Sequence, residues 1–180
     1  VAGPHSRRIN ALVGADADMK ISTRALRQEV AHVPVPKGID YSAVACVTSD
    51  SDAAVYTRPE VGNNILIGSE DPPCDTHIYV DPDNYNSNFS NQWTLQAQRL
   101  GLRFPNLGIP SKLKGCVDLY DVTEDWIPIY DRSCVEGYFM ACGTSGNQFK
   151  NAPVVGKVMA ELIEYCESGS NHDEDPMLYQ

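Results

Sequence analysis

The stretch GYFMACGTSGNQFKNAPVVGKVMAELI, residues 137–163, determines how the last part of this chain folds. An apolar strand over 138–142 runs into a small glycine-containing turn, and the turn runs directly into an amphipathic helix. Asn151 is expected to cap this helix, and Pro153 to lie in its first turn, where a missing N–H costs nothing. The N–H groups of residues 143–146 and the positive end of the helix then meet at one corner, which we expect to bind an anion.

The composition is that of an acidic globular protein. The 180 residues include 24 acidic and 14 basic side chains, which gives a net charge of −10. This charge disfavours nucleic acid and anionic membranes as partners, and no apolar run approaches the roughly 20 residues that span a bilayer. Part of the negative charge lies in an expected acidic tail, residues 169–180.

The cysteines and histidines predict neither a disulfide framework nor a metal site. The six cysteines are widely spaced without a C-x-x-C pair, and the four histidines are scattered. Free thiols favour a reducing compartment, so we expect a cytoplasmic protein. The order G-x-S-x-G of a hydrolase and the G-K-[S/T] of a P-loop are also absent from the sequence.

The middle of the chain predicts an antiparallel sheet. Short runs rich in valine, isoleucine and tyrosine alternate with Pro, Gly, Asp and Asn, too closely for crossover helices. A helix over about 92–103 follows, with Ser90 or Asn91 as its cap. Strands followed by appended helices indicate an α+β fold with a mostly antiparallel sheet. The expected strands are 26–35, 42–48, 53–57, 64–69, 76–80, 112–119, 127–130 and 138–142.

Residues 143–163 resemble the carboxy-terminal FAD-contacting segment of the D-amino-acid-oxidase-like flavoproteins, which include glycine oxidase and the sarcosine oxidases and dehydrogenases. Three further stretches fit in the same order. VAGPHSRRIN (1–10) is similar to the element in which a strand of the nucleotide domain ends beside the flavin. RQEV (27–30) looks like the strand that opens the substrate domain, and YDVTEDWIPIYD (120–131) looks like the turn before the last strand.

The resemblance implies the substrate domain of a two-domain flavoenzyme together with a returning segment of its FAD domain. The expected parts are the end of an FAD-domain strand with a short helix (1–20), a β-rich substrate domain (21–133), the flavin-contacting strand-turn-helix (134–168) and the tail. The family's fingerprint G-x-G-x-x-G does not occur in the sequence. We therefore expect a missing N-terminal FAD-binding part of the same protein to hold the adenosine and the pyrophosphate.

The resemblance also implies the residues of a site. Lys150 matches the lysine that faces the substrate carboxylate in the sarcosine oxidases, and Arg58 would bind a carboxylate through its planar guanidinium. The alternatives are a solvated Lys150, a salt bridge from Arg58 to Glu60 or Glu70, and a glycine-rich turn without a ligand. The residues expected to contact the flavin are Gly3, Gly143, Thr144, Gly146, Asn147, Gln148, Phe149 and Lys150.

The function implied is oxidation of the C–N bond of an amino acid or N-methyl amino acid, by hydride transfer to FAD. Cys116 lies near the covalent flavin attachment of some relatives but at another spacing, so non-covalent FAD is expected. The apolar run 65–68 stands where the monomeric sarcosine oxidases carry a lysine that promotes reaction with oxygen, which leaves a dehydrogenase open. The alternative is a non-catalytic, truncated or stand-alone domain that binds a small acid or a partner subunit.

Overall fold

The computed structural model describes residues 1–44 and 46–174, and these form two compact units. Unit 1 consists of Val1–Leu26, Tyr79–Asn84 and the described residues from Leu119 onward, and unit 2 consists of Arg27–Ile78 and Tyr85–Asp118. Residues 175–180 of the expected acidic tail lie outside the described residues.

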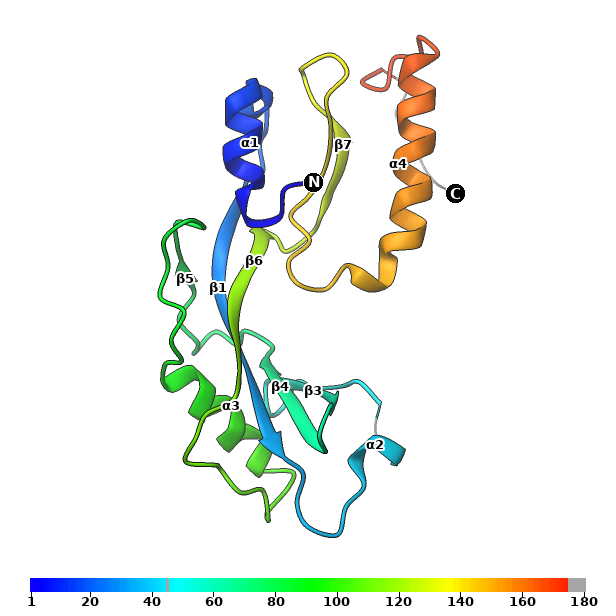
Figure 1. Ribbon diagram of the computed structural model, residues 1–180. Helices are drawn as coiled ribbons and strands as arrows, with labels where there is room; N and C mark the ends of the chain where they lie inside the picture. The colour runs from blue at the N-terminus through cyan, green and yellow to red at the C-terminus, as the bar shows by residue number, and fades with distance from the viewer. Residues whose placement is uncertain (45, 175–180) are drawn as a thin grey trace. The chain divides into compact units, whose positions relative to one another are not determined.

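The chain folds as an α+β protein whose strands pair antiparallel, which confirms the expected fold class (Figure 1). The helices are η1 (Gly3–His5), α1 (Ser6–Val13), η2 (Ala15–Ala17), α2 (Tyr41–Val44), α3 (Asn91–Gly101), η3 (Phe149–Asn151) and α4 (Ala152–Glu167). The strands are β1 (Thr23–Pro34), β2 (Thr48–Asp50), β3 (Val55–Glu60), β4 (Asn64–Ser69), β5 (Ile78–Tyr79), β6 (Gly115–Thr123), β7 (Ile129–Arg132) and β8 (Phe139–Cys142).

The units have other bounds than the expected domains. Three stretches of the expected β-rich domain, 21–26, Tyr79–Asn84 and 119–133, belong to unit 1. Strands β1 and β6, which pair with each other, each begin in one unit and end in the other. A continuous strand carries no turn residues at such a boundary, so the sequence pattern does not mark it.

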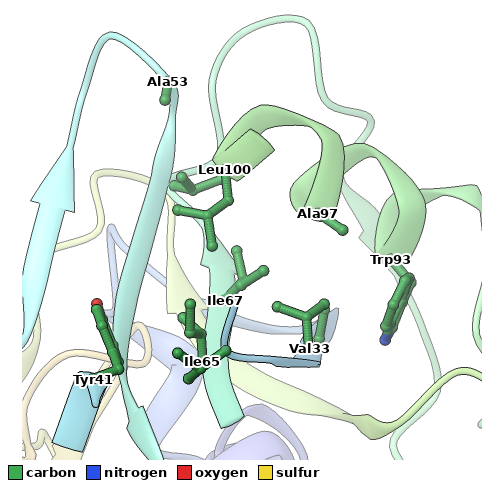
Figure 2. Packing of buried hydrophobic residues seen from close by; sticks show 11 residues of the cluster. Val33, Tyr41, Ala53, Ile65, Ile67, Trp93, Ala97 and Leu100 are labelled. Atoms are coloured by element: carbon green, nitrogen blue, oxygen red, sulfur yellow. The ribbon is translucent and has the colours of Figure 1, made fainter. Parts of the chain in front are cut away.

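The larger sheet has the order β2-β3-β4-β1-β5, and β6 also pairs with β1. Within unit 2, helix α3 packs on one face of this sheet (Figure 2). Trp93 and Leu100 of α3 are buried with Val33, Ile65 and Ile67 of the strands. The expected helix is therefore confirmed, and its apolar face covers the hydrophobic core of unit 2.

The sequence predicts the start of helix α3 correctly but misses helix α2. Ser90 caps α3 as expected, because its hydroxyl accepts a hydrogen bond from the Gln92 amide at 3.2 Å. Residues 42–48 were expected as a strand, but they contain the end of helix α2 and only the start of β2. The Asp40 carboxylate accepts hydrogen bonds from Ser42 Oγ at 2.7 Å and from the Ala43 amide at 3.3 Å, which stabilises a helical turn there.

The segment Arg27–Glu29 contains a buried ion pair that holds a long loop. Arg27 Nη1 lies 2.7 Å from Glu29 Oε1, and the two side chains are 6% and 1% exposed. Arg27 Nε donates to the carbonyl of Asn86 at 2.7 Å, and the Ser90 amide donates to Glu29 Oε1 at 2.9 Å. The pair thereby fixes the asparagine-rich stretch that leads into α3.

Unit 1 is built around the β7–β8 hairpin, with α4 packed against β7 (Figure 1). Ile9 and Leu12, two apolar residues of α1, are exposed, by 38% and 73%. The buried residues of α1 are polar, Ser6 and Asn10. Asn10 donates to the sulfur of Met19 at 3.6 Å and accepts from the Tyr138 hydroxyl at 2.9 Å. These tertiary hydrogen bonds outweigh the apolar pattern of this short helix.

Candidate functional site

The loop between β8 and α4, residues 143–150, forms the corner expected from the sequence. Gly143, Ser145 and Gly146 adopt the left-handed backbone conformation, with φ of 68°, 48° and 74°. The Asn147 amide donates to the Thr144 carbonyl at 3.1 Å and closes a tight turn. Helix α4 then begins with proline in its first turn, as expected.

Buried Asp121 in β6 organises this corner. The Gly143 amide donates to Asp121 Oδ2 at 2.8 Å, and the Ser145 amide donates to the Asp121 carbonyl at 2.8 Å. The expectation that all four amides of residues 143–146 are free is therefore wrong for these two. Within the described residues, the amides of Thr144 and Gly146 have no hydrogen-bond acceptor, and these two donors are free for a ligand.

Packing inside unit 1 explains the two glycines of the corner. A Cβ on Gly143 would lie 2.4 Å from Cγ2 of Thr123, and a Cβ on Gly146 would lie 2.2 Å from the ring of Tyr120. Both positions also have the positive φ that side chains rarely adopt. The glycines thus have a structural reason that requires no ligand, and only the groups that the corner leaves exposed can bind one.

Phe149 and Lys150 extend from the corner into solvent. The Phe149 side chain is 97% exposed, which is the largest exposure of any aromatic residue among those described. Lys150 is also exposed, and its Nζ donates to the carbonyl of Asn147 at 2.7 Å. The ammonium group is therefore held close to the corner while its remaining donors stay available.

The side chain of Gln148 is fixed from two sides. Its Oε1 accepts a hydrogen bond from Asn151 Nδ2 at 2.8 Å and another from the Tyr130 hydroxyl at 3.3 Å. Asn151 occupies the cap position of α4 but makes no capping bond with its side chain, so the expected side-chain cap is wrong. The preceding 3-10 turn η3 already supplies helical geometry there, which leaves the amide of Asn151 free to hold Gln148.

Gly3 lies in unit 1 with the corner. It has a φ of 53° and open space where a Cβ would stand, and its carbonyl accepts a bond from Ser6 Oγ at 2.7 Å. Val1 and Ala2 line one small cavity together with residues of β8. The segment that carries Gly3 therefore lies beside the strand that leads to the corner.

Arg58 belongs to unit 2, in β3, and forms the salt bridge that was the alternative to a carboxylate-binding role. Its Nη2 lies 3.1 Å from Glu60 Oε2, and the Arg58 side chain is 48% exposed. The hydrogen bond from the Val61 amide, and then the charge of Arg58, lower the pKa of Glu60. A surface pair of this kind leaves most guanidinium donors facing solvent.

The remaining sequence expectations concern thiols, metals and membranes. Cys116 is exposed overall, yet partial loss of hydration and then the charge of Asp118 raise the pKa of its thiol. In residues 1–44 and 46–174, no group of three or more metal-binding side chains comes together. No helix of the described chain has the length and apolar character required to cross a bilayer.

Sequence reasoning missed the residues behind the corner. Asp121, Tyr120 and Tyr130 all fall within 120–131, the stretch already singled out as a turn, but nothing in their spacing indicates contact with 143–150. The turn itself is confirmed, because Thr123 Oγ1 donates to the Ile127 carbonyl at 2.9 Å. The one signal in the sequence was an acidic residue, Asp121, between Tyr120 and Val122; its burial is seen only in the structure.

A family model and curated relatives both match this chain to FAD-dependent oxidoreductases. Residues 1–162 match the model of the DAO family, described as FAD dependent oxidoreductase. The chain is 27% identical over 138 residues to FAD-dependent oxidoreductase domain-containing protein 1 of Xenopus laevis, an alignment that covers 74% of this chain and 26% of the relative. The chain therefore spans about a quarter of the length of the curated relatives that it matches.

Solved structures share the fold. Glycine oxidase from Geobacillus kaustophilus superposes with a TM-score of 0.65 at 20% identity, over 90% of this chain and 40% of that enzyme. L-proline dehydrogenase from P. horikoshii superposes with a TM-score of 0.66 at 18% identity, over 95% of this chain and 42% of that enzyme. At these identities the similarity establishes the architecture.

Proposed function

Because the chain belongs to the DAO family of FAD-dependent oxidoreductases, we propose that it forms the substrate domain and the flavin-edge segment of an enzyme that oxidises the C–N bond of an amino acid or N-methyl amino acid. FAD is the cofactor of this family, and when bound it supplies the hydride acceptor. We assign the pyrophosphate site to a further part of the same protein, since G-x-G-x-x-G does not occur in these residues. The six unbonded thiols support a cytoplasmic location.

One observation supports the flavin contact most directly. The amides of Thr144 and Gly146, which have no acceptor in the described part of the chain, lie within a few residues of Phe149, which is 97% exposed. N–H donors suit the electron-rich rim of an isoalloxazine, and an aromatic side chain suits its flat apolar surface. The N-terminus of α4 adds a favourable dipole, worth about 0.3–1 kcal/mol for an anion. Gly3, Gly143, Asn147 and Gln148 complete the proposed contact set.

Lys150 is proposed to hold the substrate carboxylate. Its ammonium has three donors, of which the Asn147 carbonyl accepts one. The remaining donors would orient an amino acid by its carboxylate, and the catalytic contribution of the residue is then positioning. Arg58 is proposed to bind a carboxylate through its guanidinium, with the Glu60 salt bridge as the competing arrangement.

Replacing Phe149 by alanine tests the flavin contact. We expect the dissociation constant of FAD to rise about tenfold, because an aromatic contact is lost. The unfolding temperature of the apoprotein should not change, since this ring is 97% exposed. Leu102→Ala, in unit 2 and 71% exposed, is the matched control. The measurement is fluorescence titration of the full-length gene product with FAD; a colourless protein that takes up no FAD would instead favour the non-catalytic alternative.

Replacing Lys150 by alanine tests the substrate contact. We expect kcat/KM for an amino acid to fall about 10- to 100-fold, while kcat/KM for the corresponding amino amide stays within about threefold, because a charge-assisted bond to the carboxylate is lost. Steady-state kinetics of the FAD-loaded protein give both values. Lys157→Ala, on the exposed side of α4, controls for the charge change. An unchanged ratio between the two substrates would remove Lys150 from the site.

A further inference from the structure

Unit 1 contains a pocket that shares no residue with the corner. Its volume is about 510 Å³, within the range of small-molecule sites. Helix α1, the start of β1 and the segment after β5 form its walls. We call it the arginine pocket, and its lining residues are Pro4, Arg7, Arg8, Ala11, Thr23, Arg24, Ala25, Tyr79, Val80, Asp81 and Pro82.

The charge of the arginine pocket is opposite to that of the chain. The lining carries three guanidinium groups and one carboxylate, a net charge of +2, whereas the whole chain carries −10. The arginines attract anions to this pocket, whereas the acidic remainder of the chain repels them. The first turn of α1, which contributes Arg7 and Arg8, contains no acidic residue that would neutralise its positive end.

The three arginines keep most of their hydrogen-bond donors free. Within the described residues, Arg7 has neither an ion-pair nor a hydrogen-bond partner. Arg8 uses one donor, Nη1, on Asp83 at 2.7 Å. The guanidinium of Arg24 stacks on Tyr79 with its central carbon 4.0 Å from the ring centroid. Stacking occupies the face of a guanidinium and leaves the N–H groups on its edge available.

Hydrogen bonds within unit 1 fix the walls of the arginine pocket without a ligand. The Val80 amide donates to the Ala25 carbonyl at 3.0 Å, which fixes the strand segment that carries Tyr79. Asp83 receives both Arg8 and, at 3.0 Å, His5 Nε2, and these partners lower the pKa of its carboxyl group. The one carboxylate of the lining, Asp81, already accepts the Asp83 amide at 2.9 Å, which reduces its repulsion of an anion.

We propose that the arginine pocket binds the phosphate group of a small phosphorylated molecule. A carboxylate needs one guanidinium for bidentate binding, whereas a phosphate monoester offers three acceptor oxygens to three separate arginines. The volume exceeds what a phosphate ion fills, and the lining also includes the apolar residues Ala11, Val80 and Pro82. The net charge of −10 opposes a long polyanion such as nucleic acid, so the ligand is a small molecule.

The test is calorimetric titration of the FAD-saturated full-length protein with ribose 5-phosphate and with inorganic phosphate, at constant ionic strength in chloride. We expect both probes to bind, and Arg7→Gln to weaken each by about tenfold, because one charge-assisted contact is lost. Arg24→Gln should act in the same direction. Lys157→Gln removes the same charge from an exposed site on α4 and should leave both affinities unchanged.

Three results would overturn the proposal. The first is the absence of binding of ribose 5-phosphate, even if inorganic phosphate binds. The second is equal affinity of the native protein and the Arg7→Gln variant. The third is an equal loss in the Lys157→Gln variant, which would indicate attraction by overall charge alone. Flavin absorbance is recorded in parallel, because FAD content depends on the corner and should be the same in all these variants.

Discussion

Replacing Glu29 by alanine is expected to lower the free energy of unfolding by about 3–5 kcal/mol, because it leaves a buried charge without its partner. The side chains of Arg27 and Glu29 are 6% and 1% exposed, and their atoms lie 2.7 Å apart. The same carboxylate accepts the Ser90 amide at 2.9 Å and 3.1 Å, so the substitution also removes the support of the helix cap. Urea denaturation followed by circular dichroism gives the value.

An exposed pair provides the matched control for this prediction. Glu161 lies on α4, one turn after Lys157, with 3.6 Å between the charged atoms and 42% of its side chain exposed. Glu161→Ala should change the free energy of unfolding by about 0.3–0.5 kcal/mol, as is usual for surface pairs on helices. If Glu29→Ala were equally mild, the ion pair would not be what fixes the asparagine-rich loop.

Replacing Asp121 by alanine is the second large effect that we expect. The Gly143 amide would lose its buried acceptor, at a cost of about 1–3 kcal/mol, and the corner would lose its fixed shape. If the corner contacts flavin as proposed, FAD affinity should fall as well. Thermal unfolding monitors the first effect, and the flavin-to-protein absorbance ratio, measured well below the unfolding transition, monitors the second.

The conservative variant separates shape from charge at this position. Asp121→Asn keeps an acceptor for the Gly143 amide, so we expect it to retain the stability and the FAD content that Asp121→Ala loses. The Ser145 amide bonds to the backbone carbonyl of residue 121 and is unaffected in either variant. Equal FAD content in the alanine variant and the native protein would show that Asp121 does not position the corner for the cofactor.

The local elements and the family were predictable from the order of residues alone. Strand β4, the serine cap of α3, the proline in the first turn of α4 and the glycine turn before it each depend on residues a few positions apart, and each is confirmed. The family resemblance was carried by contiguous stretches as well, 1–10, 27–30, 120–131 and 143–163, and the match over residues 1–162 confirms it. Short-range rules of capping and backbone conformation suffice for such features.

The burial of polar side chains and the identity of their partners became known only from the packing of the elements. Asp121 contacts a residue 22 positions later in the sequence, Asn10 meets a hydroxyl 128 positions away, and the arginine pocket joins α1 to the segment after β5. Each of these contacts depends on which elements pack side by side in the tertiary structure. No periodicity within one segment contains that information, because the partners of a buried polar group come from distant parts of the chain.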